Sequence, residues 1–173
     1  MNISKEAEKL LGELALKFMP IDLEAVAKKL GINLVFDNLE DDISGFIKSE
    51  DNEAICVINK RQHANRQRFT IAHEIGHFIL HCQGKDGFYI DKGFQFRRDG
   101  NSATGVYDKE IEANNYAAGL LMPEELVKEE FQKISNEFDS YVHIPLLAKK
   151  FKVSKQAMTF RLINLKLISD VFE

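Results

Sequence analysis

Apolar residues recur every three or four positions along most of the chain, which is the spacing of an amphipathic helix. Pro20 ends the first predicted helix, and Asp22 and Gly31 are the expected cap and stop of the second. Asn59 and Asp108 are the expected N-caps of two longer helices. Helices are therefore predicted over residues 3–18, 22–30, 60–82, 108–122 and 123–138, with two or three short ones within residues 143–168.

Short runs rich in β-branched residues predict three strands, at residues 32–37, 43–48 and 54–59. A polar turn joins the last two strands, so they are expected to form a hairpin. Residues 83–107 contain five of the ten glycines and show little periodicity, which predicts a long loop with at most one strand, at residues 94–97.

The composition is that of an ordinary globular protein, with 173 residues, 45% hydrophobic and 29% charged. The net charge of -4 gives no overall field that would attract nucleic acid or an anionic membrane. No apolar run approaches the length of about 20 residues that a membrane span needs. Two cysteines, Cys56 and Cys82, make no disulfide framework, and the start of the chain has no apolar leader segment. A cytoplasmic protein without membrane contact is expected.

One short motif carries recognisable chemistry. His73, Glu74 and His77 form the pattern HExxH, and on a helix the two histidines lie one turn apart on one face. Two imidazoles at this spacing can bind one Zn²⁺, and Glu74 then lies where a general base is needed. On a helical wheel these residues fall opposite the apolar stripe of the same helix, so another element must supply a third ligand. Gly76, in the middle of that helix, indicates a close approach by another backbone.

Glu112 is the expected third ligand. It lies in the first turns of a helix that is apolar around most of its circumference, and a buried carboxylate is costly unless it is paired or bound to a metal. Three protein ligands would leave a fourth position open for water, as catalysis by zinc requires. Glu110, two residues earlier, is expected to point elsewhere and to be solvated. The alternative for Glu112 is a carboxylate favoured by the helix dipole.

Residues 66–77 together with residues 112–114 and 117–123 resemble the ImmA/IrrE family of metallopeptidases. The resemblance extends over about residues 21–168. It implies zinc ligands at His73, His77 and Glu112 and a general base at Glu74. It also implies that the chain acts on helix-turn-helix repressors of the Xre type. Family members cut such a repressor between its DNA-binding and oligomerisation parts, or otherwise inactivate it, and so derepress stress or mobile-element genes.

Peptide hydrolysis also needs a group that stabilises the negative charge developing on the carbonyl oxygen. The sequence leaves several candidates open for substrate binding or this role and does not choose among them: Tyr107, Tyr116, Tyr141, His143 and Arg97.

The C-terminal segment 143–168 has six basic and no acidic residues, which leaves 17 basic and 27 acidic residues in the rest of the chain. Its pattern is similar to a helix-turn-helix, with Lys152 where a glycine is usual at the turn. Packing or repressor docking is favoured for this segment over contact with nucleic acid.

The sequence thus predicts an α+β fold that is mostly helical. A small antiparallel three-stranded sheet is expected to pack on a zincin-like HExxH helix, with helix-turn-helix-like helices at the C-terminus. Residues 1–125 would form the metallopeptidase domain and residues 126–173 a helical subdomain packed on it. The expected function is that of a zinc endopeptidase that cleaves an Xre-type repressor. The alternative is an anti-repressor that sequesters its partner without cutting it and keeps the zinc for structure.

Overall fold

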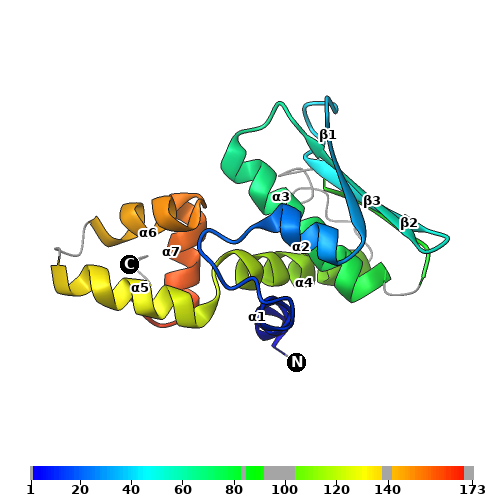
Figure 1. Cartoon of the computed structure of the whole chain (residues 1–173). Helices are drawn as coiled ribbons and strands as arrows, with labels where there is room; N and C mark the ends of the chain where they lie inside the picture. The colour runs from blue at the N-terminus through cyan, green and yellow to red at the C-terminus, as the bar shows by residue number, and fades with distance from the viewer. Residues whose placement is uncertain (1, 83–84, 92–103, 138–141, 170–173) are drawn as a thin grey trace.

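The computed structural model describes residues 2–82, 85–91, 104–137 and 142–169 (Figure 1). The predicted strand at residues 94–97 lies outside them. No helix in the described part of the chain has the length and apolar character needed to span a membrane. The elements in chain order are α1 (Ile3–Glu13), α2 (Leu23–Lys29), β1 (Ile32–Asp37), β2 (Gly45–Glu50), β3 (Glu53–Asn59), α3 (Ala64–His77), the π-helical turn η1 (Phe78–Cys82), β4 (Gly87–Asp91), α4 (Thr104–Leu121), α5 (Glu124–Glu137), α6 (His143–Phe151) and α7 (Lys155–Asn164).

The sheet has four strands in the order β1-β3-β2-β4. The predicted hairpin is confirmed, because β2 and β3 pair antiparallel across a tight turn. Asp51 and Asn52 of that turn both have positive φ, as the favoured two-residue hairpin turn requires. Strand β4 pairs antiparallel with β2 and lies at one edge of the sheet.

The prediction of three antiparallel strands is wrong in two respects. Strand β1 runs parallel to β3, and β4 is a fourth strand within a segment that was expected to be a loop. Strands β1 and β2 flank β3 on opposite sides, so the connection between them crosses the end of the sheet. Asn59 stabilises this connection, because its Nδ2 donates to the carbonyl oxygens of Glu40 and Ile43 at 3.1 and 2.8 Å.

Two helix starts also differ from the prediction. Asn59 is the last residue of β3 and its amide is engaged in the crossover, so His63 caps α3 instead, and its Nδ1 accepts from the Asn65 amide at 3.2 Å. Helix α4 begins at Thr104, four residues before Asp108. The short second helix agrees with the prediction: Asp22 caps α2, and Gly31 follows it with φ of 73°.

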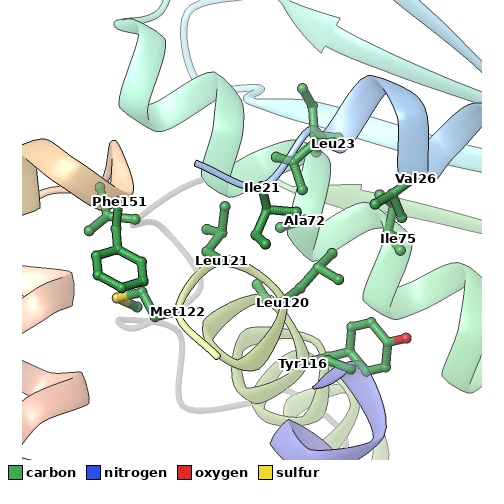
Figure 2. Close-up of a cluster of buried hydrophobic side chains, with 14 of the residues drawn as sticks. Ile21, Leu23, Val26, Ala72, Ile75, Tyr116, Leu120, Leu121, Met122 and Phe151 are labelled. Atoms are coloured by element: carbon green, nitrogen blue, oxygen red, sulfur yellow. The ribbon is translucent and has the colours of Figure 1, made fainter. Parts of the chain in front are cut away.

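Helix α3 lies between the sheet and helix α4. It packs against β2 and β3 on one side and against α4 on the other, while α1 covers α4 (Figure 1). Apolar side chains of α2, α3 and α4 meet in the core shown in Figure 2, where Ile75 and Leu120 are fully buried. This layering encloses the second half of α3, the part that carries the HExxH motif.

Two glycines allow the helices around α4 to approach closely. A Cβ at Gly76 would lie 3.1 Å from Tyr116 Cβ and 3.2 Å from Ala113 Cα, so the close backbone approach expected from the sequence is confirmed. A Cβ at Gly119 would lie 2.4 Å from the carbonyl oxygen of Ser4 on α1. The backbone of α4 is therefore in close contact with α3 on one side and with α1 on the other.

Helices α5, α6 and α7 lie together at one side of the molecule (Figure 1). Buried Arg161 of α7 ties them to the rest: its guanidinium donates to the Met122 carbonyl, Ser4 Oγ and Glu8 Oε1 at 2.8–2.9 Å. Lys150 of α6 is paired with buried Glu130 of α5. One of the six basic residues of this segment, Arg161, is thus buried, and Lys150 is paired with an acidic residue of the neighbouring helix.

Candidate metal centre

The HExxH segment lies in the second half of α3 and is buried along its whole length. His73, Glu74 and His77 are 2%, 0% and 1% exposed. The sheet covers one side of this helix and α4 the other. The second surface that the histidines were expected to face is therefore the side of α3 that packs against α4. Helix α4 also supplies a carboxylate next to them.

Glu110 of α4 lies against both histidines. Its Oε2 is 3.3 Å from His73 Nε2, and its Oε1 is 3.2 Å from His77 Nε2. The two Nε2 atoms are 3.0 Å apart, so all three side chains converge on one point. Among the described residues, His73, His77 and Glu110 form the group of possible ligands whose atoms lie close enough together to hold one metal ion.

The structure brings Glu110 to the two histidines and leaves the expected Glu112 away from them, so the expectation that Glu110 points elsewhere is wrong. Glu112 is 43% exposed at its side chain and lies 3.7 Å from His81 Nε2. The two acidic residues are about 200° apart around a helix, so only one can face α3. Ala113 of α4 touches Gly76, and Glu110 lies nearer than Glu112 to the helix face that Ala113 marks. Spacing from the small residues was the signal that could have identified Glu110.

The three side chains fit a divalent ion such as zinc. Ligands bound tetrahedrally to Zn²⁺ at about 2.0–2.1 Å lie about 3.3 Å from one another. The corresponding distances here are 3.0, 3.2 and 3.3 Å. Burial lowers the pKa of His77, which favours the neutral imidazole that a metal requires. Burial raises the pKa of Glu110, but the two adjacent histidines outweigh this and bring it to about 2, so the carboxylate is charged.

Asn114 orients the first histidine and was missed by the sequence reading. His73 Nδ1 lies 3.1 Å from Asn114 Oδ1. The amide oxygen can only accept, so Nδ1 carries the proton and Nε2 is left as the lone pair directed at the cluster. Asn114 follows Glu110 by four residues on α4, so one helix face supplies both the carboxylate and the group that fixes the tautomer of His73.

Glu74 is a fully buried carboxyl group whose two oxygens have no hydrogen-bond partner in the described part of the chain. Burial raises its pKa well above the usual value, and the nearby carboxylates of Asp91 and Glu110 raise it further, while Arg66 opposes the shift. An unpaired buried carboxyl group is costly. It is suited to exchange a proton with a bound reactant.

A polar network beside Glu74 joins α3 to the edge strand. Arg66 Nη2 donates to Asp91 Oδ2 and to Ser44 Oγ, both at 2.7 Å. Thr70 Oγ1 lies 3.4 Å from the same Asp91 oxygen, and the Ser44 amide donates to the Asp91 carbonyl at 2.8 Å. These contacts fix the end of β4 against the helix that carries the histidines.

Tyr89 and Lys109 border the cluster and were also missed by the sequence reading. The Tyr89 ring, on β4, stacks on His77 with centroids 4.6 Å apart and planes 13° apart. Lys109 Nζ donates to the Tyr89 hydroxyl at 3.1 Å. The strand β4 was not predicted, so the sequence offered no means of placing Tyr89 beside the motif.

The other candidates named from the sequence lie elsewhere or remain predictions. Tyr116 is 1% exposed in the core (Figure 2), so burial removes it from any role in substrate binding. His143 is the first residue of α6 and packs against Phe131 of α5, so its observed ring contact is within the C-terminal helices. Tyr107 is 58% exposed on α4, one turn before Glu110. Arg97 and Tyr141 lie outside the described residues.

A helix with two histidines one turn apart, completed by a carboxylate from a second helix, is the arrangement of a metallopeptidase domain. Residues 27–163 match the model of the peptidase M78 family, described as the IrrE N-terminal-like domain. The chain belongs to this family.

The chain is also similar to two other proteins. The chain is 29% identical over 104 residues to "Uncharacterized immunity region protein 2" of Bacillus phage phi105, which covers 60% of each protein. It is similar in fold to a "Mycobacterium tuberculosis transcriptional regulator", with a TM-score of 0.62 and 19% identity over 93% of this chain and 46% of that one. The chain thus spans less than two thirds of the curated relative and less than half of the solved structure.

Proposed function

We propose that this chain is a zinc-dependent endopeptidase that cleaves and inactivates an Xre-type helix-turn-helix repressor in the cytoplasm, and so derepresses stress or mobile-element genes. The observation that carries the proposal is the pairing of a His–His–Glu cluster with the buried, unpartnered carboxyl group of Glu74. A structural metal site needs no such carboxyl group beside it, and a fully buried one is costly to keep.

His73, His77 and Glu110 would hold the ion, which supplies Lewis-acid chemistry by lowering the pKa of a water and polarising a carbonyl. Glu74 takes a proton from the water while the water oxygen adds to the carbonyl carbon of the peptide. The C–N bond then breaks, and Glu74 returns the proton to the departing nitrogen. Burial raises the pKa of Glu74, and a carboxylate with a raised pKa is a better proton acceptor than an exposed one.

The repressor as substrate is supported by the relatives and by the family resemblance. One relative is named for a phage immunity region and the structural neighbour for transcriptional regulation. Helices α5–α7 would serve for packing or for docking the repressor, since Arg161 is buried against α1 and the end of α4 and Lys150 is paired with Glu130.

The test is incubation of the zinc-loaded protein with the repressor encoded beside it, followed by intact-mass measurement. We expect about one zinc per chain and two repressor fragments. Glu74→Gln should bind zinc normally and yield no fragments, and Glu112→Gln, away from the cluster, is the matched control that should cleave as the wild type does. Cleavage by Glu74→Gln at the wild-type rate contradicts the mechanism. An intact repressor in a tight complex with the wild type would instead favour sequestration without cleavage.

A further inference from the structure

Tyr89 occupies a distinctive place at the metal centre. It lies on the face of β4 that looks toward α3, and its ring stacks flat on His77 and lies 5.7 Å from the ring of His81. Strand β4 is an edge strand in the described sheet, with β2 on its paired side. Tyr89 therefore stands between the edge of the sheet and one of the imidazoles of the cluster.

The Tyr89 hydroxyl is held as an acceptor. Lys109 Nζ donates to it at 3.1 Å and also lies 5.3 Å from the centre of the ring. An ammonium group has no acceptor capacity, so the hydroxyl must accept in this contact. No described group accepts the hydroxyl's own proton, which is therefore free to be donated to a ligand. The neighbouring positive charge makes the hydroxyl a stronger donor.

Lys109 directly precedes Glu110 in α4. The same turn of helix thus presents a carboxylate to the two histidines and an ammonium group to Tyr89. The hydroxyl is in this way fixed from three elements: its strand β4, the His77 ring on α3 and the ammonium group on α4. A fixed donor beside a reacting group stabilises developing charge without having to reorganise.

We propose that the Tyr89 hydroxyl, polarised by Lys109, donates a hydrogen bond to the carbonyl oxygen of the bound peptide as negative charge develops there. This assignment rests on the proposed peptidase function and fills the role that the sequence left open. Water adds to the carbonyl carbon, Glu74 carries its proton to the leaving nitrogen, and the Tyr89 hydroxyl keeps its own proton throughout. Tyr89 is a catalytic residue in this scheme, and Lys109 is a positioning residue that acts through it.

The discriminating variant is Tyr89→Phe, which keeps the ring on His77 and removes only the hydroxyl. We expect kcat for repressor cleavage to fall about 100-fold, with KM and zinc content unchanged. Lys109→Met should lower kcat less, also at unchanged zinc content. Phe88→Leu, at the exposed neighbour of Tyr89 on β4, is the matched control and should behave as the wild type. If Tyr89 only supported the His77 ring, Tyr89→Phe would retain kcat, and that result overturns the proposal.

A binding measurement separates this proposal from the peptidase assignment itself. N-phosphoryl-leucylalanine carries a tetrahedral anionic group in place of a reacting carbonyl, and its affinity for the zinc-loaded proteins can be measured by calorimetry. Tyr89→Phe should weaken its binding at least tenfold, while Phe88→Leu leaves the affinity unchanged. If the wild type binds the probe but leaves the repressor intact, the cleavage function fails and the donor role stands. Equal affinity of Tyr89→Phe and wild type, or no measurable binding by the wild type, overturns the donor role.

Discussion

Exchanging Glu110 and Glu112 separately for glutamine tests the metal centre most directly, because the two residues are only two positions apart and lie on different faces of α4. Glutamine keeps the size and the helix propensity of glutamate and removes only the charge and one acceptor. Glu110 has an oxygen within 3.3 Å of each histidine, whereas Glu112 is 3.7 Å from His81 and is 43% exposed. Metal affinity should therefore respond to the first change and not to the second.

The expected magnitudes follow from these contacts. Changing a residue that only orients a ligand typically weakens metal binding about 10–100-fold, so removing the charged ligand itself should cost at least about 100-fold, or about 2.7 kcal/mol. Glu112 is 43% exposed and its contact with His81 is long, at 3.7 Å. A contact of this kind contributes at most about 1 kcal/mol, which limits the effect of Glu112→Gln to less than about fivefold.

The assay is competition for zinc between each metal-free variant and a chromophoric chelator at about pH 7.5, where the imidazoles are neutral. Far-ultraviolet circular dichroism shows whether both variants are folded. Strong loss of affinity in Glu112→Gln with wild-type affinity in Glu110→Gln would refute the helix-face reasoning. Unchanged affinity in both would show that neither carboxylate binds the metal.

Three further changes test other parts of the structure. Asn114→Leu should weaken zinc binding about 10–100-fold in the same competition assay, because His73 loses the partner that fixes its tautomer. Gly76→Leu should lower the free energy of unfolding, measured in urea on the metal-free protein, by about 1–3 kcal/mol, since a Cβ there already meets α4 at 3.1–3.2 Å. Burial raises the pKa of Glu130, but hydrogen bonds from Lys150 and Lys133 and the charges of these two lysines outweigh this and lower it. The ionised carboxylate therefore stabilises the fold at pH values above the usual carboxyl pKa. The stability advantage of wild type over Glu130→Gln should therefore be full at neutral pH and vanish as the pH falls below about 4; an advantage that persists in acid would contradict this.

Local sequence patterns correctly predicted the parts of the fold that are determined by residues close together in the sequence. Asp22 and Gly31 bound α2 as predicted, and the β2–β3 hairpin forms across its two-residue turn. Strand β1 was placed correctly along the chain, but its parallel pairing with β3 depends on where the connection to β2 crosses the sheet. That path is set by tertiary hydrogen bonds of Asn59, which no local pattern reveals.

The site divides in the same way. The two histidines and Glu74 follow from a motif within one helix, where spacing alone determines which side chains share a face. Glu110 and Tyr89 reach the motif from other elements, so their positions depend on how α4 and β4 pack against α3. The apolar character of the whole helix predicts a buried carboxylate, but it does not show whether Glu110 or Glu112 lies on the face that packs against α3.

The distance between α3 and α4 connects the packing of this protein to its chemistry. Gly76 and Ala113 let the two backbones touch, and only at such a separation can the short side chain of Glu110 reach two imidazoles on the facing helix. A pair of larger residues would hold the two helices further apart and so move the carboxylate away from the histidines. The small residues at this crossing are therefore best understood as a requirement of the metal centre. In a helix with several acidic residues, the one that shares a face with the small residues at the crossing is the one to test as a ligand.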